Sequence, residues 1–181
     1  MKKSEIAVFG TGCFWCTEAI FKQLRGVTSV TPGYAGGETP DPSYEQVCTG
    51  ITGYAEVAQI EFDPGAISYE DLLEIFWNVH DPTSLNRQGS DIGTQYRSTI
   101  LTTSQVQKAK TEKSLKQVEE SHQFRQPVVT VIESLNHFYR AENYHQDYYA
   151  NHSDQSYCRL VISPKLQHLR QKFAAKLIPV E

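Results

Sequence analysis

The sequence predicts an α+β protein: a two-layer α/β sandwich with a split βαβ (ferredoxin-like) core, additional helices and long loops. The order of its patterns, strand–helix–strand–strand–helix–strand, predicts this core. With 181 residues the chain is long enough for a core without disulfide staples, and we expect residues 1–181 to form a single domain. A composition of 39% hydrophobic and 21% charged residues excludes collagen-like, coiled-coil and disordered classes.

The first part of the chain accounts for three of the strands and the first helix. Strands are expected over the short apolar or alternating runs Ile6–Gly10, Val27–Thr31 and Ala55–Phe62. Apolar side chains recur at helical spacing from Phe14 to Leu24, and Gly26 is a typical helix stop. A helix therefore joins the first two strands.

Two polar segments and a second helix follow from turn and capping signals. Gly33–Gly53 is rich in Gly, Pro, Asp, Thr and Tyr, which predicts a long loop of the kind that is usually functional. Ser68 and Asp71 resemble a capping box with Asp in place of Glu, and predict a helix that ends near Val79. His80–Tyr96 is again turn-rich.

The remaining elements are predicted by the same rules. We expect strands over Ser98–Thr102 and Val128–Glu133, and helices over Ser104–His122 and Ala141–Asn151. Ser163 followed by Pro164 predicts the N-cap and first position of a final helix that runs to Leu177.

Charge and hydropathy narrow the class of partner and the compartment. The net charge of −4 predicts no basic surface for nucleic acid or an anionic membrane. No apolar run approaches the roughly 18–20 residues that span a bilayer. The run Ile6–Phe9 is too short for the core of a signal peptide beginning at Met1. We therefore expect a cytoplasmic protein.

Cysteine usage points to chemistry rather than to structural bridges. Cys13, Cys16, Cys48 and Cys158 are too few for a secreted disulfide framework, so each is expected to be free, metal-bound or catalytic. Cys13 and Cys16 form a C-x-x-C, which is typical of a redox dithiol or of half a zinc site, or arises by chance. No second pair stands at zinc spacing, and no metal is expected.

Cys13 is placed where the first strand passes into the first helix. A thiolate there is stabilised by the free amides and the positive end of the helix dipole, which lowers the thiol pKa. Phe14 and Trp15 beside it are candidates for the wall of an apolar substrate pocket. The alternative is that both aromatic residues belong to the core and both cysteines are inert and buried.

Six blocks, in order along the chain, resemble one family. They are Gly12-Cys13-Phe14-Trp15, Pro32–Gly37, Tyr44–Gly50, Thr52–Val57, His80–Thr83 and Gln88–Ser98, and Glu142–Tyr148 extends the match. The sequence is thereby similar to the A-type peptide methionine sulfoxide reductases, whose fold is an α/β sandwich with a split βαβ core.

The resemblance implies an oxidoreductase that reduces the S epimer of methionine sulfoxide, in proteins and as the free amino acid, for repair of oxidative damage. It implies no organic cofactor and no metal, with thioredoxin as the reductant. It also argues for a monomer. Oxidised proteins, peptides and free methionine sulfoxide are then the substrates.

The resemblance assigns a role to each side chain of the site. Cys13 is the nucleophile, and Glu56 is the acid whose pKa burial must raise so that it stays protonated. Tyr44 and Tyr96 donate hydrogen bonds to the sulfoxide oxygen. Asp91 organises the site.

Phe14 and Trp15 hold the S-methyl group in the same comparison. Without the family, Glu56 is an ordinary position in an alternating strand, and Tyr44 and Tyr96 are packing residues. Cys48 is expected to be buried structure, and His80 and His145 have no ligand role.

Release of the product leaves Cys13 oxidised to a sulfenic acid, and a second thiol then condenses with it to form a disulfide. The resemblance favours Cys158, in a mobile C-terminal segment of about residues 150–181, as the resolving cysteine. Cys16 is the second candidate, since the family commonly has glycine there and a bond between residues three apart is possible in a C-x-x-C. Tyr54 stands where the family often has His, which concerns only local tuning of Glu56.

Two functions of other classes compete with this hypothesis. One is a general thiol–disulfide oxidoreductase that uses Cys13 and Cys16. The other is a thiol sensor or protein-binding module whose aromatic pocket captures an oxidised side chain without reducing it.

Overall fold

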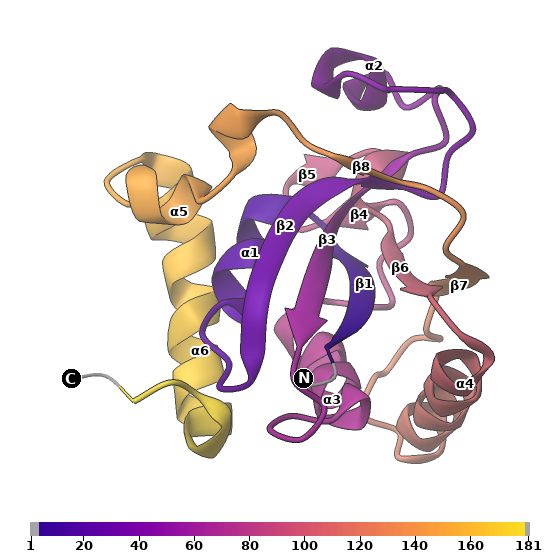
Figure 1. The fold of residues 1–181 in the computed structure, drawn as a ribbon, viewed down its shortest axis with the longest axis vertical. Coiled ribbons are helices and arrows are strands. Elements are labelled where there is room, and N and C mark those ends of the chain that lie inside the picture. Colours follow the sequence, from indigo (N-terminus) through magenta and orange to yellow (C-terminus); the bar gives the residue numbers. More distant parts are fainter. Residues whose placement is uncertain (1–3, 180–181) are drawn as a thin grey trace.

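The computed structural model describes residues 4–179, and a six-stranded sheet lies at its centre (Figure 1). Met1–Lys3, where the signal-peptide expectation begins, and residues 180–181 lie outside the described residues. The strand order is β7 (Val131–Ser134), β6 (Ser98–Thr102), β1 (Glu5–Thr11), β3 (Ala55–Phe62), β2 (Val27–Ala35) and β8 (Phe138–Arg140). Over residues 4–179 no helix combines the length and apolarity that a membrane crossing requires.

The sheet is mixed. β3 lies between β1 and β2 and is antiparallel to both, so α1 (Phe14–Phe21) crosses over one strand when it joins β1 to β2. β6 is antiparallel to β1 and β8 is antiparallel to β2, whereas β7 is parallel to β6. This order brings the end of β1, just before Cys13, close to the start of β3, which carries Glu56.

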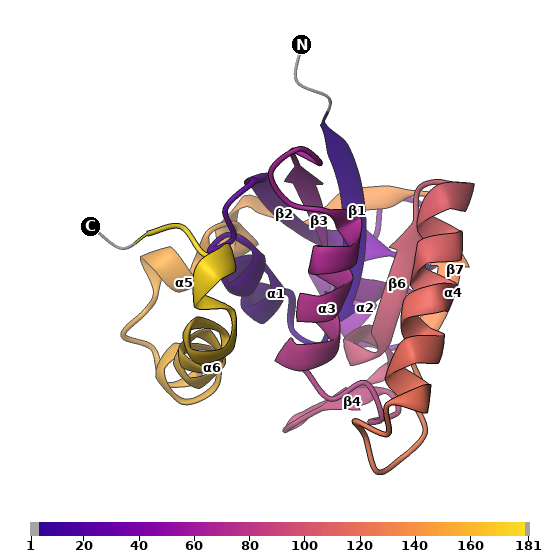
Figure 2. The ribbon, with the colours of Figure 1, turned by 90° about the horizontal axis from the view of Figure 1, so that it is seen from below.

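Alternation along the strands separates two apolar layers. Phe9 and Ile60 face the larger cluster, which includes residues of α1, α3 (Tyr69–Val79) and α6 (Ser163–Phe173). α4 (Gln105–Glu120) adds partly buried residues to the same cluster. Figure 2 shows α1, α3 and α4 side by side along this face of the sheet.

The opposite face of the sheet carries a smaller cluster. Val8 and Val57 point to this side, where Leu135 and Phe138 cover them. Gly33 of β2 permits the close approach of this covering segment, because a Cβ there would lie 2.3 Å from the Phe138 ring and 2.4 Å from a carbonyl oxygen. The chain from β7 to β8 therefore closes the second face.

Most predicted elements are present, with changes at several boundaries. The capping box of Ser68 and Asp71 is confirmed at the start of α3. The loop predicted over Gly33–Gly53 instead contains the end of β2 and a short helix, α2 (Tyr44–Cys48). The strand predicted over Val128–Glu133 is confined to Val131–Ser134, because the three residues before it make no ladder.

Three expectations for the C-terminal third were wrong. The prediction missed β8, because three residues are too few to show alternation. The helix expected over Ala141–Asn151 is broken into a 3-10 turn (Asn143–His145) and α5 (Tyr148–Asn151), separated by Asp147 at φ +55°. Ser163 does not cap the final helix, because a π-helical turn (Cys158–Ile162) already leads into α6.

The two remaining strands form a small hairpin beside the site. β4 (Arg87–Gln88) pairs with β5 (Asp91–Ile92), and a 3-10 turn (Thr94–Tyr96) follows. His80, before this hairpin, is partly buried; its Nδ1 donates to Phe76 O (2.8 Å), and its Nε2 accepts from the Ser98 hydroxyl (2.7 Å). Burial lowers the pKa of His80 to about 3, so the imidazole is neutral at physiological pH. Its two hydrogen bonds connect α3 to β6.

Candidate active site

Cys13 lies at the junction between β1 and α1, as predicted. Gly12 before it has φ +103°, and a Cβ on it would lie 2.7 Å from Gln88 Cβ, so only glycine fits this turn. Cys13 is the N-cap residue of α1 and makes no capping hydrogen bond with its side chain. The first amides of α1 are therefore available to another acceptor.

Glu56 of β3 is that acceptor. Its Oε2 accepts a hydrogen bond from Phe14 N–H at 3.0 Å, and its side chain is buried. Burial raises the pKa of Glu56 to about 8, against the opposing effect of the Phe14 bond, and the charges of Asp91 and Cys16 raise it further. A carboxylic acid that is protonated at neutral pH thus lies beside Cys13, and the expected rise of this pKa is confirmed.

Cys13 and Cys16 are both buried, and Cys16 N–H donates to Cys13 O at 3.1 Å in the first turn of α1. Burial, hydrogen bonding toward the Cys16 thiol and the charge of Glu56 raise the pKa of Cys13. The bond from Cys13 lowers the pKa of Cys16 to about 7, although burial opposes it, and Lys165 assists. The expectation of a lowered pKa at Cys13 was therefore wrong for this state, and Cys16 is the thiol of the pair whose pKa is lowered.

Trp15 and Phe14 have different surroundings. Trp15 is partly exposed, stacks on Tyr148 at 3.6 Å between ring centroids, and donates its indole N–H to His145 Nδ1 at 3.0 Å. Phe14 is only 1% exposed and packs between Tyr34 and His145. Trp15 is therefore partly open to solvent, whereas Phe14 belongs to the core.

Tyr44 and Tyr96 reach the site from separate loops. Tyr44 begins α2, Tyr96 ends the 3-10 turn after β5, and both are half-buried. Burial raises the pKa of Tyr44 above its usual range, helped by a hydrogen bond with Cys48 and by the charge of Glu56. Burial and the charges of Glu56 and Cys13 do the same for Tyr96. Both phenols therefore remain hydrogen-bond donors.

Asp91 closes the site on the side of the C-terminal segment. Its Oδ2 accepts a hydrogen bond from the Tyr157 hydroxyl at 2.7 Å, and the same hydroxyl lies 3.8 Å from Cys16 Sγ. Tyr157 also meets the Trp15 ring edge-on at 5.8 Å. One phenol thus connects Asp91, a thiol and the exposed aromatic ring.

The structure corrects two expectations about the other cysteines. Cys158 is fully buried at the start of the π-helical turn and belongs to the same apolar cluster as Cys13 and Cys16, so it does not lie in a free tail. Cys48 is exposed at the end of α2 rather than buried. All four cysteines, each among the described residues, are free thiols in this state.

A family model described as peptide methionine sulfoxide reductase matches residues 5–177. The chain belongs to this family. It is accordingly an oxidoreductase, of a family that acts generally in protein repair after oxidative stress.

Relatives and solved structures agree with this family. Peptide methionine sulfoxide reductase MsrA of Polynucleobacter asymbioticus is 52% identical over 97% of this chain and 92% of its own. The relative of the same name in Nitratiruptor sp. is 54% identical over 94% and 97%. Reduced Mxr1 of Saccharomyces cerevisiae has a TM-score of 0.79 at 34% identity, covering 86% of this chain and 90% of the yeast chain. A structure of Mxr1 in complex with Trx2 shares the fold, with a TM-score of 0.56 at 24% identity, covering 81% and 85%.

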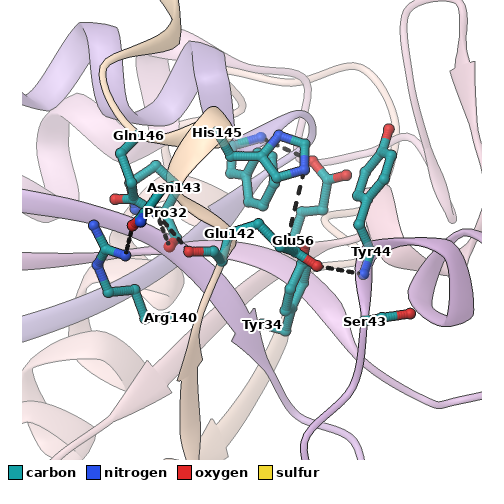
Figure 3. A network of polar contacts seen from close by, with 12 residues as sticks. Pro32, Tyr34, Ser43, Tyr44, Glu56, Arg140, Glu142, Asn143, His145 and Gln146 are labelled. Carbon is teal, nitrogen blue, oxygen red and sulfur yellow. Dashed lines mark hydrogen bonds and ion pairs between the residues drawn. The ribbon is translucent and has the colours of Figure 1, made fainter.

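The sequence analysis missed three side chains that hold this reductase site together. Glu142, His145 and Tyr157 contact the predicted site residues, and Figure 3 shows the first two among Tyr34 and Tyr44. The block Glu142–Tyr148 was visible as a family block but carried no role. Tyr157 stands next to Cys158, and that adjacency was the signal for it.

Proposed function

We propose that this reductase converts methionine-S-sulfoxide to methionine, in proteins and as the free amino acid, with Cys13 as the nucleophile. The observation that carries the proposal is the arrangement at the start of α1. There the Cys13 thiol and the protonated Glu56 carboxyl lie together, and Phe14 N–H orients the carboxyl.

The chemistry follows from these positions. Cys13 Sγ attacks the sulfoxide sulfur while Glu56 gives its proton to the sulfoxide oxygen. The attack forms a bond between the two sulfurs, and the S–O bond breaks with loss of the protonated oxygen as water. Water then attacks Cys13 Sγ, breaks the bond between the sulfurs and releases methionine, which leaves Cys13 as a sulfenic acid; two electrons have passed from the thiol to the substrate. Tyr44 and Tyr96 donate hydrogen bonds to the oxygen as it gains negative charge.

Cys13 becomes nucleophilic by passing its proton to Cys16. The placement of both residues in the first turn of α1 and the lower pKa of Cys16 support this transfer. Trp15, which is partly exposed and anchored through His145, holds the S-methyl group. Phe14 supports that ring, and Asp91 positions the Tyr157 hydroxyl.

For the second half of the reaction we propose a relay. The nearness of Cys16 to Cys13, with Cys16 N–H bonded to Cys13 O at 3.1 Å, supports Cys16 as the first resolving cysteine. The Cys16 sulfur attacks the Cys13 sulfenic acid, forms the disulfide and displaces the hydroxyl group, which leaves as water with the Cys16 proton. Cys158, in the same cluster, then attacks Cys16, so that a Cys16–Cys158 disulfide forms and Cys13 is released as a thiol. This second disulfide is the one that thioredoxin reduces. Such exchange requires movement of the π-helical turn (Cys158–Ile162), and turns of this kind are common at functional sites.

The remaining features of the proposal concern the whole chain. The antiparallel β3 between β1 and β2 supports a split βαβ (ferredoxin-like) core within a single domain. Thiols supply both electrons, so the reaction requires no metal or organic cofactor. Thioredoxin as the reductant is supported by the complex of the similar yeast Mxr1 with Trx2. The net charge of −4 argues against nucleic acid or an anionic membrane as the partner. We propose a cytoplasmic monomer that acts on oxidised proteins.

A stereospecific assay tests the function. The protein is incubated separately with peptide-bound methionine-S-sulfoxide and its R epimer, with dithiothreitol as reductant and Cys13→Ser as the control. We expect reduction of the S epimer alone, and none by Cys13→Ser. Folded protein that turns over neither epimer would contradict the proposal, and insulin-disulfide reduction would then test for a general thiol–disulfide oxidoreductase.

The relay is tested by trapping one turnover. After a single oxidative turnover without reductant, Cys158→Ser protein is digested and its disulfide-linked peptides are identified by mass spectrometry. We expect a Cys13–Cys16 loop. In the wild type a second disulfide that includes Cys158 follows with time. A direct Cys13–Cys158 bond formed equally fast in Cys16→Ser would overturn the order of the relay.

A further inference from the structure

Glu142, just after β8, contacts the segment that carries Tyr44. Its Oε1 accepts a hydrogen bond from Tyr44 N–H at 2.8 Å, and its Oε2 accepts one from the Tyr34 hydroxyl at 2.7 Å (Figure 3). Tyr44 is the first residue of a five-residue helix, and Tyr34 belongs to β2. One carboxylate thus joins a short, otherwise lightly packed helix to the central sheet.

The same carboxylate faces a buried imidazole. His145 accepts the Trp15 indole N–H on Nδ1, so its remaining proton is on Nε2. That nitrogen is buried without a hydrogen bond to any described residue, and it lies 3.8 Å from Glu142 Oε2. The imidazole packs against the Tyr44 ring at 4.5 Å between centroids. Glu142 therefore holds the Tyr44 backbone directly and faces the residue that packs on its ring.

We propose that Glu142 is a positioning residue for Tyr44: it fixes the backbone by its hydrogen bond and the ring through His145, and so aims the phenol at the sulfoxide oxygen. This inference rests on the proposed function. Its physical basis is that a hydrogen-bond donor stabilises a transition state only when it is already aimed at the developing charge.

The contacts of Glu142 agree with a charged acceptor. Burial alone would raise the pKa of Glu142, but hydrogen bonds from its own backbone N–H, the Tyr34 hydroxyl and Tyr44 N–H lower it. Glu45, the next residue of α2, makes none of the hydrogen bonds that join Tyr34, Tyr44 and Glu142. It is therefore a matched control that removes a neighbouring carboxylate without releasing Tyr44.

The test is a double-mutant cycle on reduction of methionine-S-sulfoxide. We expect Glu142→Ala to lower kcat by about 10-fold or more with a smaller change in KM, because misaligned catalytic groups cost up to roughly 100-fold. Tyr44→Phe removes the phenol, so Glu142→Ala added to it lowers kcat by less than about 3-fold. Glu142→Gln, whose amide oxygen still accepts from Tyr44 N–H, restores most of the loss.

Full additivity in the Tyr44→Phe background, or an equal loss in Glu142→Gln and Glu142→Ala, overturns the inference. If Glu142→Ala does not fold, Glu142→Asp replaces it in the cycle, because the shorter side chain keeps the charge and withdraws the acceptor. Wild type and Glu45→Ala are measured in the same assay. Inactivity of both contradicts the proposed function, whereas normal activity of both together with normal activity of Glu142→Ala contradicts only the role of Glu142.

Discussion

At the scale of single residues, the site is defined by two groups whose pKa values differ from their ordinary ones. Glu56 is a carboxyl group that keeps its proton because it is buried, and Cys16 is a thiol whose pKa is lowered because Cys13 donates to it. The two effects support each other, because the charge on Cys16 raises the pKa of Glu56. The nucleophile, proton acceptor and proton donor of the proposed mechanism therefore lie within the first turn of α1 and on its neighbour β3.

For Glu56 we predict that removing the titrating carboxyl lowers activity but raises stability near pH 8. With a pKa of about 8, Glu56 is protonated below that pH, so activity is expected to fall as pH rises through 8. Folding binds its proton more tightly than the unfolded chain does, so its contribution to stability is full below about pH 4 and is lost as pH rises through 8. Glu56→Gln abolishes this loss, and we expect it to lower kcat by at least about 100-fold while raising the free energy of unfolding near pH 8 by on the order of 2 kcal/mol.

Denaturant unfolding at pH 5 and pH 8, alongside the activity assay, checks both signs. Glu61, a partly exposed glutamate of the same strand, provides the control: Glu61→Gln removes a carboxylate that is not buried. A Glu56→Gln variant that is active, or that is less stable than the wild type at pH 8, would show that this carboxyl is not the buried acid.

At the scale of elements, short-range signals in the sequence determine where the helices begin. α3 is an example, because Ser68 Oγ accepts from Asp71 N–H at 3.0 Å and Asp71 Oδ2 accepts from Ser68 N–H at 3.0 Å. α2 has the same arrangement between Ser43 and Gln46. Of these two helices, only α2 carries a site residue, Tyr44. Removing the cap of α3 therefore tests stability without changing the site.

Ser68→Ala is expected to lower the free energy of unfolding by about 1 kcal/mol, because it leaves the Asp71 amide without its acceptor. Activity should be unchanged, since α3 contributes no residue to the site. Thermal or denaturant unfolding measures the effect, and Ser134→Ala, at an exposed position of β7, is the control. Equal stability of the two variants would contradict the role of the cap.

At the scale of the whole molecule, the helices and the sheet meet around Phe9. Its ring is fully buried and lies 5.6 Å from Phe21, 6.0 Å from Tyr69 and 5.1 Å from Phe76, between centroids. The same strand ends two residues later at Thr11, just before Cys13. Packing at Phe9 therefore secures the strand that delivers the nucleophile.

Phe9→Ala is expected to cost about 3–5 kcal/mol, because it opens a cavity between α1, α3 and β1. Phe9→Leu fills most of that volume and should cost clearly less. Denaturant unfolding compares the two variants with the wild type. A loss below about 1 kcal/mol for Phe9→Ala would show that the centre of the core lies elsewhere.

The sequence by itself determined the local features of this protein. Periodicity, glycine stops and the capping box located β1, α1, β3 and α3, because these signals depend on neighbours a few residues apart. The family blocks named Cys13 and Glu56 as site residues, and the position of Cys13 before a helix followed from the apolar run Ile6–Gly10 and the helical spacing that starts at Phe14.

Only the tertiary structure decided how these residues affect one another. The raised pKa of Cys13, the buried position of Cys158 and the exposure of Cys48 depend on contacts between segments distant in sequence. Glu142 meets Tyr44 across 98 positions of the chain, and Trp15 meets His145 across 130. Burial and charge act through space, so no pattern of nearby residues reveals them.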